Sequence, residues 1–90
     1  MRIITKAIRE KLPSELIQTI WDFYDESYYK ISKDEYQFFL IENKEKTTTL
    51  KMWQEEPSAM KIKSIPKFKE CEVWIINDGD VLTMLFPEDY

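Results

Sequence analysis

The chain has 90 residues, with 13 Lys and Arg against 17 Asp and Glu, which gives a net charge of −4. A chain of this length forms one domain with a small core, and its hydrophobic content of 43% excludes an extended disordered protein. It contains no His and one Cys, which excludes a His–Cys metal site, a Ser–His pair and an internal disulfide. We therefore expect a single globular domain over residues 1–90, located in the cytoplasm, with no membrane span and no cofactor.

The first expected elements are a short strand and an amphipathic helix. Residues 2–8 interleave β-branched and apolar residues with cations, which favours a strand at a sheet edge. Pro13 suits a first helical position because it has no amide hydrogen to satisfy, and Glu15 complements the helix dipole there. The spacing of apolar residues predicts a helix from Pro13 to about Tyr29. Its apolar face comprises Leu16, Ile17, Ile20, Trp21, Tyr24 and Tyr28.

The rest of the chain is rich in residues that favour strands. Residues 36–41 and 47–53 are apolar or β-branched runs joined by a polar segment, which predicts a hairpin. Residues 61–69 alternate Lys with apolar side chains and are interrupted by a proline, which indicates a loop or an irregular edge. The runs 72–76 and 81–85 flank an Asp-Gly pair, which is a strong signal for a second hairpin.

The second hairpin has a predicted register and predicted faces. A two-residue turn would place Ile76 opposite Val81. Strand alternation then puts Val73, Ile75, Leu82 and Met84 on one face, and Trp74, Ile76, Val81 and Thr83 on the other. Together the elements predict an α+β fold in which one amphipathic helix packs on an antiparallel sheet of about four or five strands. The face that carries Trp74 would be partly uncovered, or else covered by residues 61–69.

Three parts of the sequence together resemble a known family. They are residues 2–8 with 12–16 and Trp21, residues 54–57, and residues 74–80 with 83–90. They resemble a family of short proteins from Gram-positive bacteria of the Bacillus and Staphylococcus kind, their phages and their mobile elements, catalogued as domain of unknown function nine hundred and sixty. The likeness spans the whole chain and implies a genomic setting and a fold, but no mechanism.

Acidic residues gather in two segments that we predict to bind a partner protein. Carboxylates recur on the expected helix at roughly helical spacing, and such a stripe could imitate nucleic-acid phosphates toward a basic protein. The alternative is an ordinary solvated helix face. A cation site at the Asp-Gly-Asp segment is a weaker interpretation, because tight turns favour Asp-Gly for backbone reasons. The predicted partner-binding residues are Glu15, Asp22, Asp25, Glu26, Asp78, Asp80, Glu88 and Asp89.

Basic residues support a different function. A single-stranded nucleic acid could bind a platform that combines lysines with the stacking groups Phe68, Trp53 and Tyr36. The predicted basic residues of this platform are Lys61, Lys63, Lys67 and Lys69. Against this alternative, the chain as a whole is acidic, and cations at a sheet edge also serve to prevent aggregation. We expect most of the large aromatic residues to lie in the core, namely Trp21, Tyr24, Tyr36, Phe38, Trp53 and Trp74.

The sequence shows no arrangement typical of an enzyme. Cys71 has no His partner, and the one Gly cannot build a phosphate-binding loop. We therefore predict a non-enzymatic protein-binding module of a phage or mobile element. Its expected partner is a bacterial protein, and its expected effect is inhibition of nucleic-acid-handling or immunity machinery, of an anti-CRISPR or anti-restriction type. The alternatives are a small single-stranded nucleic-acid-binding accessory protein and a structural subunit. We expect a monomer or a small homo-oligomer.

Overall fold

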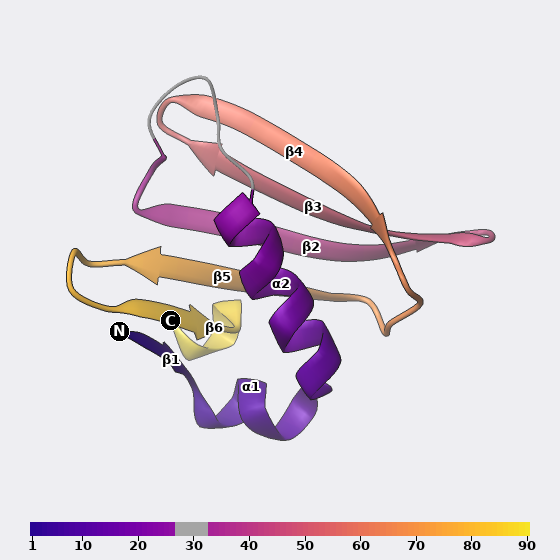
Figure 1. Cartoon of the computed structure of the whole chain (residues 1–90), viewed down its shortest axis with the longest axis horizontal. Coiled ribbons are helices and arrows are strands. Elements are labelled where there is room, and N and C mark those ends of the chain that lie inside the picture. Colours follow the sequence, from indigo (N-terminus) through magenta and orange to yellow (C-terminus); the bar gives the residue numbers. More distant parts are fainter. Residues whose placement is uncertain (27–32) are drawn as a thin grey trace.

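Figure 1 shows the computed structural model of the chain, which describes residues 1–26 and 33–90. The elements in chain order are β1 (Arg2–Ile4), α1 (Lys6–Lys11), α2 (Ser14–Glu26), β2 (Tyr36–Lys44), β3 (Thr47–Glu55), β4 (Ser58–Ile65), β5 (Cys71–Asn77), β6 (Leu82–Leu85) and the 3-10 helix η1 (Pro87–Asp89). The strands form one sheet in the order β1-β6-β5-β2-β3-β4. The predicted α+β class is confirmed, although the described residues contain six strands, more than predicted.

The N-terminal segment combines a strand with a short helix. β1 pairs with β6 in parallel, so the prediction of a wholly antiparallel sheet is wrong at this edge. The strand ends at Ile4 because the hydroxyl of Thr5 accepts a hydrogen bond from the amide of Ile8 at 3.3 Å and thereby begins α1. The strand predicted for residues 2–8 is therefore correct only in its first part. In α1, Ile8 is completely buried.

The main helix, α2, follows its predicted pattern. The carbonyl of Pro13 accepts hydrogen bonds from the amides of Leu16 and Ile17 at 3.0 and 3.1 Å, so the helix begins where the proline indicated. The predicted apolar residues that the structure describes are buried or half-buried, and Phe23 is buried in addition. The predicted extension to residues 27–29, with Tyr28, lies outside the described residues. Phe23 lies three residues after Ile20, so helical spacing also places it on this face, and the ammonium of Lys63 in β4 lies 5.2 Å from its ring.

The central hairpin of β2 and β3 is confirmed, and its strands are longer than predicted. The segment that follows differs from the prediction, because residues 58–65 form a regular edge strand paired with β3 over its whole length. Pro66 comes directly after the last residue of β4, so its missing amide removes no hydrogen bond from the ladder. Since residues 61–65 lie within the sheet, they do not cover either face of it.

The β5–β6 hairpin has the predicted faces but a different register. Ile76 lies opposite Thr83 rather than Val81, because the strands are joined by the four residues 78–81 and not by a two-residue turn. The carboxylate of Asp78 accepts hydrogen bonds from the amides of Asp80 and Val81 at 3.2 and 2.9 Å, which stabilises the longer loop. A register shift of two residues leaves every side chain on its predicted face.

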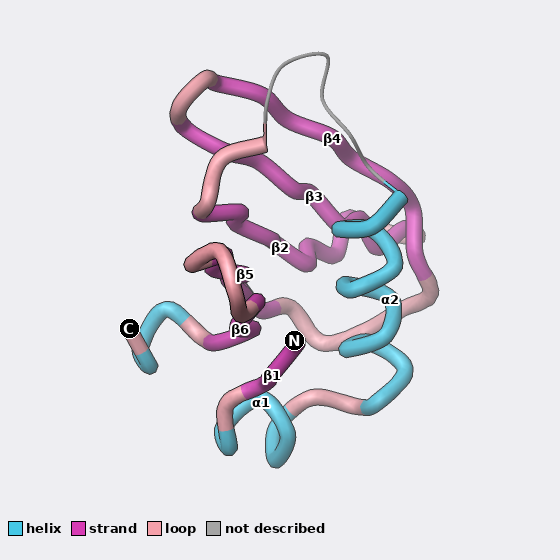
Figure 2. Tube along the Cα trace, turned by 60° about the vertical axis from the view of Figure 1, so that its left-hand side comes forward, coloured by secondary structure: helices cyan, strands magenta, loops and turns pink. Residues whose placement is uncertain are grey.

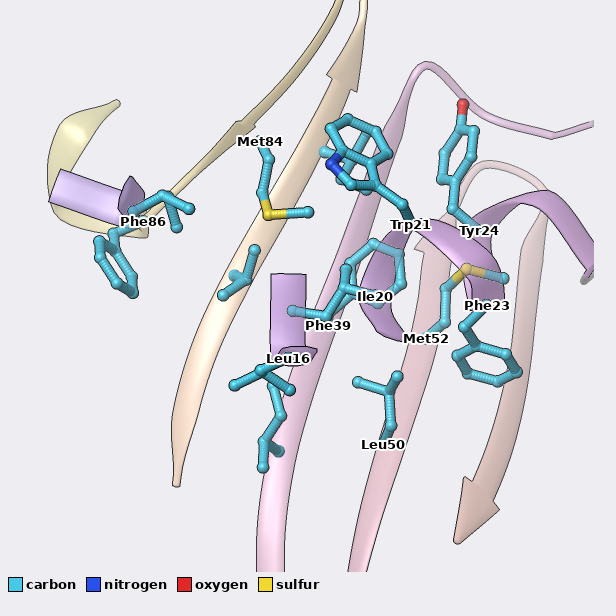
Figure 3. Packing of buried hydrophobic residues seen from close by; sticks show 14 residues of the cluster. Leu16, Ile20, Trp21, Phe23, Tyr24, Phe39, Leu50, Met52, Met84 and Phe86 are labelled. Carbon is cyan, nitrogen blue, oxygen red and sulfur yellow. The ribbon is translucent and has the colours of Figure 1, made fainter. Parts of the chain in front are cut away.

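The core lies between the helices and one face of the sheet (Figure 3), which we call the inner face. Alternate residues of the central strands are completely buried there, among them Phe39, Leu50 and Ile75. They pack against Leu16 and Ile20 of α2. The described residues contain no helix that is long and apolar enough to cross a membrane.

Cys71 begins β5 and packs at the edge of this core, where burial raises the pKa of its thiol to about 11. We expect iodoacetamide to alkylate the native protein at pH 8 about 100-fold more slowly than the urea-unfolded chain, whose thiol has a pKa of about 8.5. The measurement is the rate of mass increase in each state. Equal rates would contradict the burial of this thiol.

Candidate functional site

The face of the sheet opposite the helices, which we call the outer face, carries a continuous row of large apolar side chains. The strand register places Phe38 directly between Trp53 and Trp74, and Trp53 opposite Met60. Directly paired residues share a face of the sheet. Figure 2 shows α2 on one side of the sheet and the C-terminal η1 on the other. Among the described residues, no helix longer than η1 covers the outer face, so this row is half-exposed.

The aromatic rings of this row contact one another. The Phe38 ring lies 5.5 Å from that of Trp53 and 5.2 Å from that of Trp74, with interplanar angles of 36° and 80°. Two charged groups fix the outer rings of the row: Lys51 places its ammonium 4.9 Å from the Trp53 ring, and Glu72 accepts a hydrogen bond from the Trp74 indole at 3.0 Å. Such contacts order the rings, so the row presents a defined surface.

The C-terminal residues extend the row by a further ring. Tyr90 lies 5.4 Å from the Trp74 ring and 6.0 Å from the Tyr36 ring, and the two tyrosine hydroxyls are 2.8 Å apart. This hydrogen bond raises the pKa of Tyr36, as do partial desolvation and the nearby carboxylates. η1 holds Tyr90 in this position because the Asp89 carboxylate accepts hydrogen bonds from the Phe86 amide at 3.1 Å and from a threonine hydroxyl of the N-terminal segment at 3.0 Å.

A hollow of about 300 Å³ lies where these rings meet the ends of β2 and β3. We call it the aromatic hollow. Four rings and three carboxylates line it, and none of its lining residues is basic. The lining residues are Asp34, Tyr36, Phe38, Glu55, Glu56, Trp74 and Tyr90. The hollow therefore combines aromatic faces with negative charge.

The acidic residues predicted on the helix lie exposed on α2, but two of them form ion pairs. The carboxylate of Asp25 pairs with the guanidinium of Arg2, and that of Glu26 lies 2.7 Å from the ammonium of Lys63. Asp22 accepts a hydrogen bond from Gln18 at 2.8 Å. Glu15 lies in the first turn of the helix. The stripe is therefore partly neutralised within the chain.

Two of the four acidic residues predicted near the C-terminus accept hydrogen bonds that stabilise turns. Asp78 stabilises the β5–β6 loop and Asp89 holds η1, through the hydrogen bonds described above. Asp80 lies beside the N-terminus, whose ammonium donates to its backbone carbonyl at 3.3 Å. Glu88 lies apart from these, at a groove beside α1. The part of the chain that the structure describes holds no cluster of three or more acidic or Cys side chains arranged for a metal ion.

The structure brings together only part of the predicted basic platform: Lys67 and Lys69 flank Phe68 in the loop after β4, whereas the other predicted lysines lie apart from the stacking groups. Lys61 and Lys63 are opposite buried residues of β3, which places them on the inner side of the sheet. Trp53 and Tyr36 lie on the outer face, and Phe68 packs against the core. Lys67 and Lys69 are exposed in the loop after β4. The sheet thus separates the lysines of β4 from the aromatic row, which weakens the case for a single-strand platform.

A second groove, of about 720 Å³, lies between the α1–α2 junction, the start of β5 and η1. Its lining includes the apolar residues Leu12 and Phe86 and charges of both signs, among them Lys11 and Lys69 as well as Glu72 and Glu88. This mixture gives the groove no clear preference for one kind of ligand.

The comparison with known proteins agrees with the sequence resemblance. The model of a family described as Staphylococcal protein of unknown function (DUF960) matches residues 1–89. The chain belongs to this family. One solved structure is similar to the chain, described as "Crystal structure of the protein of unknown function from Enterococcus faecalis". The two have a TM-score of 0.86 and 23% identity, over 99% of this chain and 89% of that one. At that identity the likeness shows the fold alone. No curated protein matches the chain.

Sequence reasoning missed the aromatic hollow because most of the large aromatic residues were predicted to lie in the core. Trp21 and Tyr24 do so, whereas the four on strands are half-buried on the outer face. Those four are Tyr36, Phe38, Trp53 and Trp74. The signal that could have identified them is alternation, because each stands next in sequence to a completely or almost completely buried residue such as Phe39 or Met52.

Proposed function

We propose that this protein is a non-enzymatic protein-binding module whose interaction surface is the outer face of the sheet. The supporting observation is the aromatic row on a sheet face that, among residues 1–26 and 33–90, no helix longer than η1 covers. On β4 the row ends with Met60 and Ile62, which are 56% and 55% exposed. Contiguous exposed apolar surface is typical of interaction sites, and Trp and Tyr are the most frequent anchors of protein interfaces.

The charge around the outer face favours a protein over a nucleic acid. Nucleic-acid binding depends on Lys and Arg that neutralise phosphates. At the aromatic hollow the charged side chains are instead Asp34, Glu55 and Glu56, which would repel a phosphate backbone. On β4, Lys63 is directed to the other side of the sheet, where it pairs with Glu26. A protein partner with apolar and basic side chains fits this surface better.

The chemistry of the chain also favours binding over catalysis. The sequence contains no His, and the thiol of Cys71 is protonated at neutral pH because burial raises its pKa to about 11. A protonated thiol is a poor nucleophile. From the sequence resemblance, the proposal also keeps a bacterial protein partner, an origin in a phage or mobile element and an inhibitory effect.

The preferred surface differs from the one the sequence suggested. The carboxylates of Asp25 and Glu26 are engaged within the chain, whereas Met60 and Ile62 extend to solvent. Two double variants distinguish these surfaces, and each raises the net charge by two. Met60→Lys with Ile62→Lys alters the outer face, and Glu15→Gln with Asp22→Asn alters the acidic helix face.

The experiment captures host proteins on the immobilised chain, identifies them by mass spectrometry and measures the affinity of each purified partner by calorimetry. We expect the outer-face double variant to weaken binding of the specific partner at least about tenfold, since two apolar contacts are replaced by charges. The helix-face double variant should bind normally. The proposal is wrong if the helix-face variant loses the partner and the outer-face variant retains it.

A further inference from the structure

We propose that the aromatic hollow binds an arginine side chain of the partner protein. The inference rests on the protein-binding function proposed above and specifies the chemistry of its central contact. Three features of the hollow support it: the orientation of its rings, the charge of its rim and its size.

The rings of the hollow form the walls of a corner. Tyr90 is inclined by 59° to Trp74 and by 78° to Tyr36, and Trp74 is nearly perpendicular to Phe38. A cation placed in such a corner interacts with more than one aromatic ring, and each ring face carries negative electrostatic potential. The hydrogen bond between the tyrosine hydroxyls at 2.8 Å holds two of the rings in place before a ligand arrives.

The rim of the hollow supplies negative charge that no described Lys or Arg neutralises. Glu55 and Glu56 are exposed at the β3–β4 turn, and neither forms an ion pair within residues 1–26 and 33–90. Asp34 accepts a hydrogen bond from the backbone amide of Glu56 at 3.2 Å, which ties the two sides of the rim together. Lys33, next to Asp34 in sequence, donates instead to the carbonyl of Tyr24 at 2.8 Å.

An arginine fits these features better than other cationic groups. Its planar guanidinium stacks on aromatic faces and offers five donors that match carboxylates in a fixed geometry. A lysine ammonium is a compact, strongly hydrated charge with no planar face. The volume of about 300 Å³ lies at the lower end of the range for small-molecule pockets, which suits one side chain. The outer face already holds one cation on a ring, where Lys51 lies over Trp53.

The test uses N-acetyl-arginine amide as the probe and follows the indole signals of the whole chain by nuclear magnetic resonance. The indole of Trp74 adjoins the hollow, whereas Trp21 is buried on the inner face and serves as an internal reference. We expect saturable shifts at Trp74 with little change at Trp21. N-acetyl-citrulline amide has the same shape without the charge, and it should bind about fivefold to tenfold more weakly. Equal binding of the two probes would overturn the proposal, as would tighter binding of N-acetyl-lysine amide.

Two variants test the two halves of the site. Glu55→Gln with Glu56→Gln should weaken the arginine probe about fivefold, because the rim loses two charges. Tyr90→Leu should weaken binding of the probe by a similar factor. The variant removes one aromatic ring of the corner but keeps an apolar side chain at that position. Glu10→Gln, at an exposed position of α1, is the matched control and should leave the affinity unchanged. Unchanged affinity in both site variants would place the probe elsewhere and refute the assignment.

The free probe makes this test independent of the partner's identity. If the outer-face double variant loses the partner but the arginine and citrulline probes bind with equal affinity, the protein-binding function is supported and the arginine site is refuted. If the arginine probe binds as expected but the outer-face variant retains the partner, the hollow is supported as a site for an arginine side chain. The outer face is then refuted as the surface that binds this partner.

Discussion

A Phe39→Ala variant is expected to lose about 3–5 kcal/mol of unfolding free energy, which is the cost of removing a phenyl ring from a close-packed core. Phe39 is 0% exposed and belongs to β2, which lies between β5 and β3 in the sheet. The ring packs in the cluster that joins α2 to the inner face, as Figure 3 shows. Because native domains have a total stability of about 5–15 kcal/mol, this loss removes a large fraction of the stability and should lower the urea midpoint strongly.

The neighbouring residue provides the control. Phe38→Ala makes the same chemical change one position earlier, on the outer face, where the side chain is only half-buried. It removes contacts with Trp53 and Trp74 but leaves no cavity in the core, and we expect it to cost about 1–2 kcal/mol. Urea denaturation followed by circular dichroism measures both. Equal losses would mean that the outer face is packed as tightly as the core.

The parts of this fold that follow local rules could be predicted from the sequence. The start of α2 follows from Pro13, and its inner face follows from the helical spacing of residues such as Leu16 and Ile20. The faces of β5 and β6 follow from alternation, which survives the error in register because the error equals two residues. The periodicity of apolar residues indicates which side chains are buried. The length of the β5–β6 loop depends instead on hydrogen bonds such as those accepted by Asp78.

The parts that depend on contacts between distant segments could not be predicted in this way. The parallel pairing of β1 with β6 and the position of β2 between β3 and β5 are properties of strand order, on which periodicity carries no information. The aromatic hollow depends on that order, since it unites residues from positions 34 to 38, 55 and 56, 74 and 90. The acidic stripe predicted on the helix was judged without its ion pairs for the same reason. Arg2 pairs with Asp25 and Lys63 pairs with Glu26, and both cations are distant in sequence.

A buried pair of glutamines connects the core with the rim of the hollow. The side-chain oxygen of Gln54 accepts hydrogen bonds from the amide of Asp34 and from the side chain of Gln37, both at 2.8 Å. Its side-chain nitrogen donates to the carbonyl of Pro57 at 2.7 Å. Gln37 donates further to the carbonyl of Asp34 at 3.0 Å. Both glutamine side chains are buried, so these bonds replace hydration that the backbone of the rim would otherwise need.

Gln54→Ala is therefore expected to cost about 3 kcal/mol of unfolding free energy, because it removes at least three hydrogen bonds made by a buried side chain and leaves a small cavity. Gln18→Ala, on the exposed side of α2, is the matched control. Within residues 1–26 and 33–90 its side chain bonds only to the exposed carboxylate of Asp22, and the expected change is within about 0.5 kcal/mol. Urea denaturation of the two variants gives the comparison.

The same substitution should also loosen the rim of the aromatic hollow. Gln54 accepts a hydrogen bond from the amide of Asp34 and donates one to the carbonyl of Pro57 in the β3–β4 turn. The carboxylate of Asp34 accepts a hydrogen bond from the amide of Glu56. Hydrogen exchange of the Asp34 amide should therefore accelerate more than that of amides in β5, which take part in none of the four hydrogen bonds described above. If exchange accelerates equally in both places, the glutamine pair stabilises the whole sheet and does not specifically order the rim. Selective acceleration would show that the carboxylates of the hollow are held in place from the core.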